Sequence, residues 1–468
     1  MRTAVEVVGL ASTLYALALN LTYLLLWPLA RRGMTRTVRR RSWAWHEEAF
    51  ASPLTPGISI LVPAFNEETV ILESVRSLLA QRYSRFEVVV VDDGSTDETA
   101  GTLIDAYDLR QVTPAPPKRL EYEPVTEMYR GAAPHDITLV RKANGGRADA
   151  LNAALDVARH PYVVVTDADS IIDPDGLSVM VRPVLEDPER VIAVGGTIRV
   201  GNSCRIESGR VVEARLPNGR LAAYQVIEYL RAFLFGRVAW DSIGALVIVS
   251  GAFGLFRRDV VDEVGGYWTD TVGEDLELTV RLHRHMREQD RPYRITFAPD
   301  PVCWTEVPSD MGSLGRQRRR WHRGLGETLW RHRSMMLRPR YGTPGMIALP
   351  YFLTFEFAGP LMELAAWIAF PIGLALGIVS WHLVAAFILC SWVLGTLVTL
   401  VACGLEEQGY RNYRRVRDLG RMMCLAVFEN MWFRQLIDFY RLAGVYDIAR
   451  RKQGWGAMRR TGFNEASR

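Results

Sequence analysis

The chain has 468 residues, of which 49% are hydrophobic and 23% are charged, and its formal net charge is +4. This length predicts two or three units rather than one small domain. A bundle made only of membrane helices would carry fewer charges, and the small net charge gives no indication of nucleic-acid binding. The five cysteines include no CxxC pair, which argues against a disulfide framework and against a structural zinc site.

The first apolar segment runs from Val7 to Leu29 and is long enough to cross a bilayer as a helix. A run of arginines follows it between Arg31 and Arg41, whereas a signal peptide carries its positive charge before the apolar core. We therefore expect a retained membrane helix with its N-terminus outside and its basic flank in the cytoplasm.

A second apolar region predicts two further spans, Pro360–Val379 and His382–Cys403. Glu363 lies inside the first span, where a carboxylate is expected to be paired or to face the interior of the bundle. The stretch before Pro360 is expected to form a partial or interfacial helix. The amphipathic segment Met422–Tyr446 predicts an interfacial helix rather than a full span.

Between the membrane segments, residues 52–340 contain apolar runs that alternate with helical patterns. Strands are predicted at Ile58–Pro63, Phe86–Val91 and Tyr162–Thr166, and helices at Glu68–Gln81, Thr99–Tyr107 and Ala148–Arg159. Continuous apolar strands that alternate with helices are typical of a parallel sheet covered on both faces. The proline-rich segment Thr113–Pro134 is expected to be an irregular loop or insertion.

Two of the predicted strands run directly into acidic residues. Asp92 and Asp93 follow the second strand, and Asp167 and Asp169 follow the third. Ligands of open α/β sheets bind outside the carboxyl ends of the strands, so these carboxylates are expected to converge on one crevice. Mg²⁺ or Mn²⁺ would bridge such carboxylates to the phosphates of a leaving nucleoside diphosphate. Each pair also has a structural explanation as a turn, a helix cap or the start of a loop.

Two further clusters carry charge that suits catalysis. Glu274 and Asp275 precede a helical pattern, where the helix dipole favours acidic residues in any case, and they are also candidates for a base that deprotonates an acceptor hydroxyl. A basic cluster surrounds Gln317, Arg320 and Trp321. It is typical of an amphipathic helix on anionic lipid, and Arg320 is also a candidate for bidentate binding of a diphosphate.

These clusters, in this order, resemble the processive branch of family 2 glycosyltransferases, which includes cellulose, chitin, hyaluronan and poly-N-acetylglucosamine synthases. The matching segments are Val62–Glu68, Val91–Ser95, Lys142–Asn152, Asp167–Asp169, Ser250–Gly254, Gly273–Asp275 and Gln317–Trp321. Each segment alone is weakly specific, whereas the ordered set is highly specific. The chain departs from the family pattern at Arg147, where Lys is frequent, and at Gly273, where Thr is frequent.

The resemblance implies an α/β fold of the GT-A (Rossmann-like) type, with a cytoplasmic glycosyltransferase domain inserted between transmembrane helices. The expected divisions are an N-terminal membrane helix with its basic flank (1–51), the glycosyltransferase domain (52–340), transmembrane helices (341–404), and a loop, amphipathic helix and basic tail (405–468).

The resemblance also implies roles for individual residues. The donor site would contain Pro63, Phe65, Glu67, Asp92, Asp93, Lys142, Arg147, Asp167, Gln317 and Arg320. Asp169 would hold Mg²⁺ or Mn²⁺, with Asp167 beside it. Asp275 would be the catalytic base, with Glu274 adjacent, and the acceptor would lie against Gly251, Ala252, Phe253 and Trp321. One in-line attack by the activated hydroxyl would invert the anomeric configuration.

The pattern predicts an inverting, processive synthase in the inner or plasma membrane that adds β-linked sugars, with N-acetylglucosamine favoured, from a UDP-sugar. Its partners would be the donor, a growing glycan or lipid acceptor, membrane lipids and accessory export proteins, with no nucleic acid. Two alternatives stay open. One is a non-processive transferase that acts on a lipid carrier or glycolipid, and the other is a transporter or scaffold with a degenerate nucleotide-binding domain. Intact Asp169, Asp275 and Arg320 argue against the latter.

Overall fold

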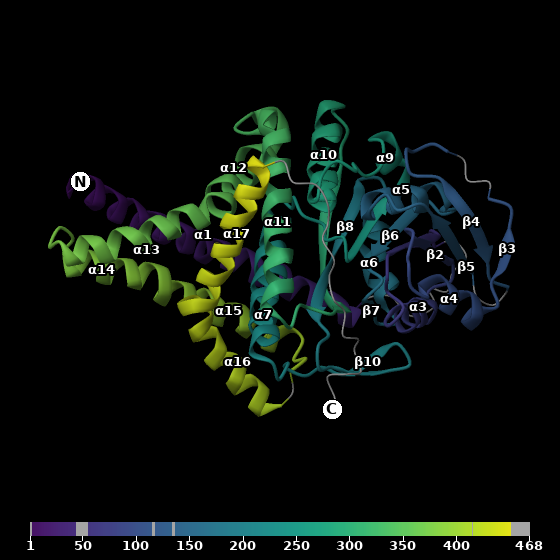
Figure 1. The fold of residues 1–468 in the computed structure, drawn as a ribbon, viewed down its shortest axis with the longest axis horizontal. Helices are drawn as coiled ribbons and strands as arrows, with labels where there is room; N and C mark the ends of the chain where they lie inside the picture. Colours follow the sequence, from purple (N-terminus) through teal and green to yellow (C-terminus); the bar gives the residue numbers. More distant parts are fainter. Residues whose placement is uncertain (1, 44–54, 115–117, 133–135, 414, 451–468) are drawn as a thin grey trace.

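The computed structural model describes residues 2–43, 55–114, 118–132, 136–413 and 415–450. An α/β domain built on a mixed sheet packs against a group of long apolar helices (Figure 1). One cluster of buried hydrophobic residues extends from the sheet to the first helix, α1 (Arg2–Trp43), where it includes Leu19 and Leu26. The two parts therefore share a continuous core.

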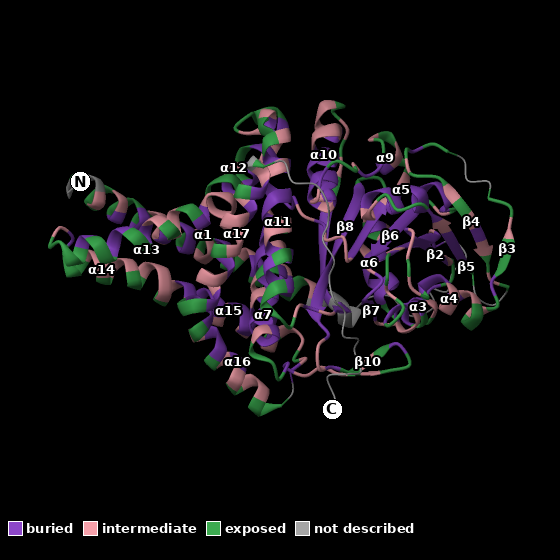
Figure 2. Cartoon of the chain, viewed as in Figure 1, coloured by how far each residue is buried: buried purple, intermediate pink, exposed green. Residues whose placement is uncertain are grey.

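The centre of the sheet consists of parallel strands, and all of them except Ile137–Lys142 were predicted from their apolar runs. They are β1 (Ile58–Ala64), β2 (Phe86–Asp92), β5 (Ile137–Lys142) and β6 (Tyr162–Thr166), in the order β5-β2-β1-β6. The strands are buried on both faces (Figure 2), which explains their unbroken Val, Ile and Leu sequences. The register sets Ala64 beside Asp92, so the loops that follow the strands leave from one edge of the sheet.

The helices that follow these strands are α3 (Ile71–Leu79), α4 (Thr99–Tyr107) and α5 (Arg147–Val157). They lie within a few residues of the predicted ranges. Helix α5 packs on β1 and β2 and is buried from Ala148 to its end. The residue before it, Gly146, has a φ of 92°, a left-handed conformation that favours glycine and turns the chain sharply into the helix.

The sheet is mixed, which corrects the expectation of a wholly parallel sheet. Strand β11 (Phe253–Arg257) is antiparallel to both β6 and β8 (Val191–Val200). Strand β12 (Arg294–Thr305) is parallel to β8, and β7 (Ser170–Ile172) is antiparallel to β12. The parallel pairing of β1, β2, β5 and β6 thus does not extend to the second half of the domain.

The segment Thr113–Pro134 was expected to be irregular, and this is wrong for part of it. It contains β4 (Val125–Arg130), which pairs antiparallel with β5 and with the edge strand β3 (Arg110–Val112). Prolines flank β4 rather than interrupt it, since Pro124 directly precedes Val125. Proline is tolerated at the start of a strand, so the many prolines of this segment did not exclude a strand within it.

The remaining elements surround the second half of the sheet and lead to the membrane helices. They are α6 (Gly176–Glu186), β9 (Arg205–Glu207), β10 (Arg210–Glu213), α7 (Arg220–Tyr229), η1 (Leu230–Arg237), α8 (Val238–Ser242), α9 (Arg258–Glu263), α10 (Glu274–Glu288), α11 (Met311–Arg331), η2 (Arg333–Met335) and η3 (Pro339–Tyr341). Helices α10 and α11 stand beside each other at the side of the sheet that faces the apolar helices (Figure 1).

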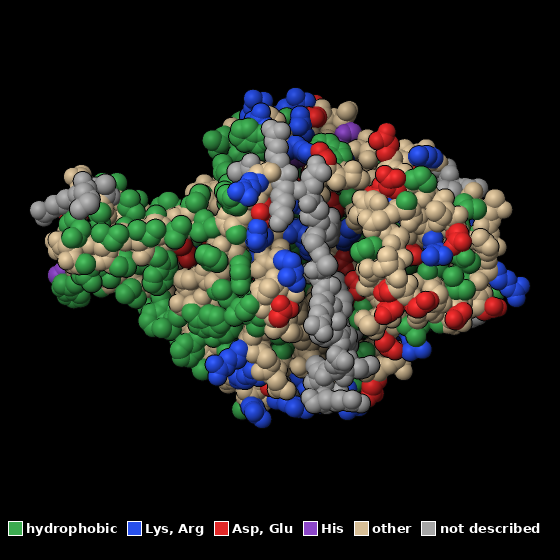
Figure 3. Space-filling model, in the orientation of Figure 1, with side chains coloured by type: hydrophobic (Ala, Val, Ile, Leu, Met, Phe, Trp, Pro, Cys, Tyr) green, Lys and Arg blue, Asp and Glu red, His purple; other side chains and the backbone are tan. Residues whose placement is uncertain are grey.

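Three helices in the described part of the chain are long and apolar enough to cross a membrane: Val5–Thr37, Pro344–Ala375 and Trp381–Gly409. They overlap in sequence with the three expected apolar segments. In Figure 3 hydrophobic side chains cover the visible surface of α13 (Gly359–Ala375) and α14 (Trp381–Ile388). Such a surface suits contact with lipid rather than water.

The second span differs from its predicted bounds. The stretch before Pro360 is the first half of this helix, because η4 (Pro344–Ala348), α12 (Leu349–Tyr351) and η5 (Phe352–Phe357) lead into α13. The helix also ends at Ala375 rather than Val379. Gly377 turns the chain with a φ of 64°, and the Ser380 hydroxyl caps the next helix by accepting a hydrogen bond from the Leu383 amide.

The last span comprises α14, η6 (Leu389–Val393) and α15 (Leu394–Gly409), and it is followed by α16 (Val416–Phe428), η7 (Glu429–Phe433) and α17 (Arg434–Ala449). Helix α17 packs along α11, where Gly444 lets the two backbones come close. Its expected interfacial position in the membrane stays a prediction. Glu363 was expected to be paired or to face the interior of the bundle, and its Oε1 lies 2.9 Å from Arg434 Nε in α17.

Candidate active site

A cavity of about 1530 Å³ lies between the carboxyl edge of the sheet, the loop before α10, α11 and the apolar helices. Most of the predicted site residues form its wall, although they come from distant parts of the sequence. They are Pro63, Phe65, Glu67, Asp93, Arg147, Asp167, Asp169, Gly251, Ala252, Glu274, Asp275, Gln317, Arg320 and Trp321. The structure thus brings the acidic and basic clusters together around one space.

Three predicted site residues do not reach this wall, and their expected contacts with donor or acceptor stay predictions. Asp92 is buried, and its carboxylate accepts hydrogen bonds from the Ser95 amide (3.0 Å) and Arg141 Nε (3.3 Å). Lys142 is buried among carboxylates. Phe253 begins β11 and points into the core against Gly196. Successive side chains of a strand point to opposite faces, and a motif alone does not tell which face is inward.

Asp93 organises the loop between β5 and α5. Its carboxylate accepts hydrogen bonds from Lys142 Nζ (2.6 Å) and from the amides of Gly145 (3.0 Å) and Gly146 (2.7 Å). Burial raises the pKa of Asp93, while Lys142 and the two amides act in the opposite direction. Gly94 is required beside it, because its φ is 75° and a Cβ there would lie 2.9 Å from the Asn144 amide nitrogen. The Lys142 ammonium group, which was expected in the donor site, therefore binds a carboxylate of the protein itself.

Arg147 lies at the centre of the site and joins three segments of the chain. Its guanidinium donates hydrogen bonds to Asp167 Oδ1 (2.7 and 3.0 Å), to Glu274 Oε1 (2.6 Å) and to the Gly251 carbonyl (2.7 Å). Burial opposes the charge of Arg147, but Asp167, Glu274 and Asp275 outweigh it and raise the pKa of Arg147. Burial raises the pKa of Glu274, and Arg147 acts against that shift. The cation thus holds the two acidic clusters in place.

Asp275 stands in the first turn of α10 with its carboxylate at the cavity wall. Its Oδ2 accepts a hydrogen bond from the Gly251 amide (3.0 Å), and its Oδ1 accepts one from the Leu276 amide (2.7 Å). Both oxygens are thus oriented by backbone donors. A carboxylate oxygen has a further lone pair, so Asp275 can also accept a proton from a molecule in the cavity.

Asp167 and Asp169 follow β6 and differ in exposure. The Asp167 side chain is 34% exposed and bound by Arg147, whereas Asp169 is buried and accepts a hydrogen bond from Thr305 Oγ1 (3.3 Å). No group of three or more His, Cys, Asp or Glu side chains among the described residues is arranged to hold a metal ion. Two carboxylates at the cavity wall nevertheless fit Mg²⁺ or Mn²⁺, which take oxygen ligands and fill their shell with phosphate and water.

Helix α11 supplies the basic side of the cavity. Asp310 caps its first turn by accepting a hydrogen bond from the Ser313 amide (2.8 Å). The spacing of Gln317, Arg320 and Trp321 places them on one face of the helix, toward the cavity. The guanidinium of Arg318 lies 4.4 Å from the centre of the Trp321 ring, which is 42% exposed and so presents an apolar surface to the cavity.

Sequence reasoning missed several wall residues. Arg237, at the end of η1, lies over the Phe233 ring at 3.8 Å, and burial lowers the pKa of Arg237 to about 10. Two arginines, Arg231 and Arg237, interrupt the otherwise apolar stretch Leu230–Val238, and both line the cavity. The cavity also continues between the apolar helices, where Asn20 and Tyr23 of α1 line it. Contacts of this kind depend on long-range packing that no local pattern encodes.

The strand-end carboxylates, the loop before α10 and the basic helix α11 define the class of protein to which this chain belongs. The family model described as glycosyltransferase like family 2 matches residues 56–324, more than half of the chain. The chain is therefore a member of glycosyltransferase family 2, with a GT-A fold.

Particular relatives refine this assignment. The chain is 31% identical over 278 residues to the poly-beta-1,6-N-acetyl-D-glucosamine synthase of Staphylococcus aureus (strain COL), an alignment that covers 59% of this chain and 56% of that protein. It is 29% identical over 276 residues to the synthase of the same name from Staphylococcus epidermidis, with the same coverage. The chain thus spans just over half the length of the curated relatives it matches.

A solved structure supports the fold over nearly the whole chain. A mannosyltransferase from Pyrobaculum calidifontis, in complex with GDP-Man and Mn²⁺, superposes with a TM-score of 0.52 at 23% sequence identity. The match covers 90% of this chain and 99% of that one, so it includes the apolar helices as well as the sheet domain.

Proposed function

We propose that this protein is a membrane-bound, inverting glycosyltransferase that repeatedly adds β-linked sugars from a UDP-sugar to a growing glycan. The observation that carries the proposal is the convergence of Asp169, Asp275 and Arg320 on one cavity that continues between the apolar helices. The names of the curated relatives favour N-acetylglucosamine as the sugar and a β-1,6 linkage.

The nucleotide would bind at the sheet edge. Phe65 is 48% exposed at the end of β1 and offers an apolar surface to a base, and Asp93 and Glu67 offer acceptors to its polar edge. The diphosphate would lie toward α11, where Arg320 makes charge-assisted hydrogen bonds to its oxygens and Gln317 donates a further one. These contacts would fix the anomeric carbon near the middle of the cavity.

Asp169, with Asp167 beside it, would hold Mg²⁺ or Mn²⁺, whose charge stabilises the departing diphosphate. Arg147 donates to Asp167 and to Glu274, so it would hold both carboxylates in position beside the metal.

Asp275 would act as the base. It accepts the proton of the acceptor hydroxyl while that oxygen attacks the anomeric carbon from the side opposite the diphosphate. One displacement inverts the configuration, and no nucleophile of the enzyme is required. Trp321 would present its ring to the terminal sugar of the acceptor. Gly251, whose amide donates to Asp275, lines the same cavity.

The product would grow into the part of the cavity between the apolar helices. Polar side chains from α1, η5 and α17 line this part, among them Asn20, Glu356 and Arg441. A sugar chain needs hydrogen-bonding partners at that depth, and these residues provide them. The glycosyltransferase domain would then lie in the cytoplasm, where nucleotide sugars are found, with the basic flank of α1 on the same side.

The test is turnover by the purified full chain in detergent or lipid nanodiscs. A panel of UDP-sugars is supplied with Mg²⁺ or Mn²⁺, and UDP release and product length are measured. We expect the fastest release from UDP-N-acetylglucosamine and a long, β-linked product. If the product is a single sugar on a lipid, the protein is a non-processive transferase rather than a processive synthase. A folded protein that releases no UDP from any donor would overturn the proposal.

A further inference from the structure

Helix α11 carries a second set of contacts on the face that bears the segment Gln317–Trp321. Gly324, Glu327 and Arg331 continue the same spacing of three and four residues, so they lie on that face further along the helix. Each of them touches the segment Asp270–Asp275, here called the base loop, which ends at Asp275 in the first turn of α10. One helical face therefore serves both the basic cluster and the loop that carries Asp275.

Glu327 makes the central contact. Its Oε2 accepts hydrogen bonds from Thr271 Oγ1 (2.9 Å) and from the Val272 amide (3.3 Å), and its Oε1 lies 3.4 Å from Arg323 Nε one turn earlier in α11. Glu327 and Thr271 both line the cavity. The carboxylate thus ties the backbone of the base loop to the helix that carries Arg320.

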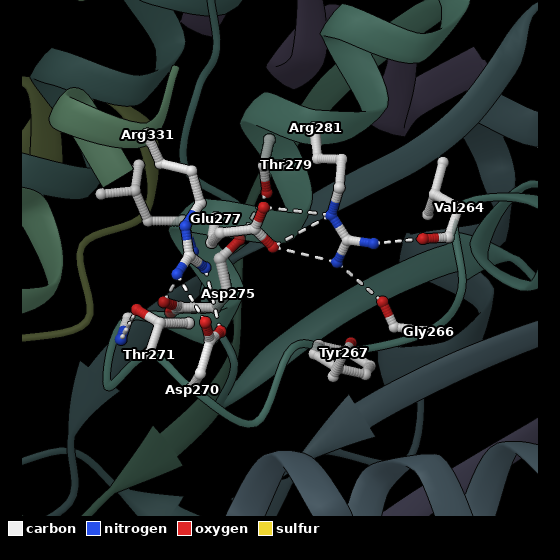
Figure 4. Close-up of polar contacts among 12 residues, drawn as sticks. Val264, Gly266, Tyr267, Asp270, Thr271, Asp275, Glu277, Thr279, Arg281 and Arg331 are labelled. Atoms are coloured by element: carbon white, nitrogen blue, oxygen red, sulfur yellow. Dashed lines mark hydrogen bonds and ion pairs between the residues drawn. The ribbon is translucent and has the colours of Figure 1, made fainter. Parts of the chain in front are cut away.

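Backbone contact reinforces this connection. A Cβ placed on Gly324 would lie 2.7 Å from the Gly273 Cα, and a Cβ placed on Gly273 would lie 2.9 Å from the Gly324 Cα. Both glycines are needed for the loop and the helix to touch. Arg331 completes the connection at the other end of the loop with a bidentate ion pair to Asp270 (2.6 and 3.0 Å; Figure 4).

The opposite side of the base loop rests on a rigid support. In Figure 4 the Arg281 guanidinium lies between Glu277 of the same helix and the carbonyls of Val264 and Gly266. Glu277 Oε1 also lies 3.1 Å from Nε2 of His332, directly after α11. The chain before the loop and the helix after it are therefore fixed. Arg147 and the Gly251 amide hold the end of the loop at Glu274 and Asp275, and the contacts with α11 hold its first part.

We propose that Glu327 is a positioning residue for Asp275. Through Thr271 and Val272 it couples the base loop to the helix that carries Gln317 and Arg320, so that the base and the diphosphate site keep one relative position. This inference rests on the proposed glycosyltransferase function. A displacement of about 1 Å at a reacting group can cost about 100-fold in rate, so the effect should fall on kcat rather than on donor binding.

The first test compares Glu327→Ala with Glu327→Gln. We expect E327A to lower kcat by about 10- to 100-fold with a donor KM within about 3-fold of the wild type, because Glu327 acts through Asp275. E327Q keeps a carbonyl oxygen that accepts from Thr271 and Val272, so its kcat should stay within about 3-fold of the wild type. Glu407→Ala is the matched control, since Glu407 forms an exposed i, i+4 pair with Arg411 far from the cavity and its loss should change neither constant.

The second test asks whether the residues act as one unit. Thr271→Val removes the hydroxyl at nearly constant volume, and its effect should not add to that of E327A in the double variant. E327A should also cause no further loss in a background of Asp275→Asn. UDP affinity, measured by calorimetry, should be unchanged throughout. If E327A fails to fold, the comparison of Thr271→Val with Thr271→Ser decides, with the hydroxyl of Ser expected to restore kcat.

Several results would overturn the inference. They are a wild-type kcat in E327A, a raised KM with unchanged kcat, a loss in E327Q as large as in E327A, or additive losses in the T271V/E327A double variant. Each of these leaves the proposed function intact, because the wild type still releases UDP. A wild-type protein that shows no turnover with any donor would instead remove the function on which the inference rests.

Discussion

Arg147 Nη1 lies 2.6 Å from Glu274 Oε1, and this contact joins the first turn of α5 to the first turn of α10. The same guanidinium binds Asp167, so one cation balances both acidic clusters of the cavity. A buried carboxylate without its partner is costly, because burial disfavours its charged form. The site is therefore assembled around Arg147 before any donor enters.

The first prediction concerns this cation. Arg147→Gln should lower kcat by at least about 10-fold and also lower the thermal midpoint, since Asp167 and Glu274 lose their shared partner. Arg147→Lys keeps the charge but one ammonium does not reproduce the planar fork, so an intermediate kcat is expected. Steady-state kinetics measures kcat, and thermal unfolding in detergent measures the midpoint. Equal activity of R147Q and wild type would show that the cation is dispensable.

The second prediction uses the contact between Gly324 and Gly273. Gly324→Ala places a methyl group 2.7 Å from the Gly273 Cα and 2.8 Å from its nitrogen, so the base loop must move. We expect a loss of at least about 10-fold in kcat with UDP affinity retained. Gly404→Ala in α15 is the control, because a Cβ there meets nothing within 4 Å. An active G324A variant would mean that the loop tolerates displacement.

The third prediction concerns acid stability. His283 is buried, its Nδ1 lies 2.8 Å from the Tyr293 hydroxyl, its Nε2 lies 2.8 Å from the Leu246 carbonyl oxygen, and burial lowers the pKa of His283 to about 4. In the unfolded chain the pKa of the His283 imidazole is about 6.5. The contribution of the neutral, buried imidazole to the free energy of unfolding is therefore present above that pH and is lost as the pH falls toward 4. This group should contribute about 2 kcal/mol less at pH 5 than at pH 7.

The measurement is the difference in thermal midpoint between pH 7 and pH 5 for the wild type and for His283→Gln, whose side chain does not titrate. The variant is expected to lose less stability on acidification than the wild type, although it starts from a lower midpoint. An identical pH dependence of the two proteins would exclude His283 as a source of acid sensitivity.

The fourth prediction concerns the metal. Chelation with EDTA should stop UDP release, and added Mn²⁺ or Mg²⁺ should restore it. Asp169→Asn should raise the concentration of metal needed for half-maximal activity, and it should weaken metal-dependent UDP binding measured by calorimetry. Asp173→Asn is a useful control, because Asp173 lies outside the cavity wall. Full activity after exhaustive chelation would show that UDP release does not require a metal ion.

The central strands could be predicted because the burial of each strand depends mainly on its own residues. Phe86–Val91 and Tyr162–Thr166 are buried on both faces, and only a continuous apolar strand satisfies that position. The acids after these strands were predicted to converge, and Asp93, Asp167 and Asp169 do reach one cavity. Their roles in binding and catalysis stay predictions.

Local patterns are less informative where an outcome depends on a partner distant in sequence. Lys142 was predicted to line the donor site, and in the structure Asp93 binds its ammonium group inside the protein. Phe253 belongs to a matching segment, but its position in β11 turns it into the core. Arg237 and Asn20 line the cavity because helices far apart in the chain pack together, and no motif marks them. The strand β4 was missed because flanking prolines masked its alternating pattern.

The central claim is that Asp275 deprotonates an acceptor in the cavity that Asp169 and Arg320 also face. The most direct measurement compares UDP release from UDP-N-acetylglucosamine by the wild type and by Asp275→Asn, together with the affinity of each for the donor. Loss of a base is expected to cost about 100- to 10,000-fold in kcat while donor affinity stays within about 3-fold. Wild-type turnover in the folded D275N variant would contradict the account.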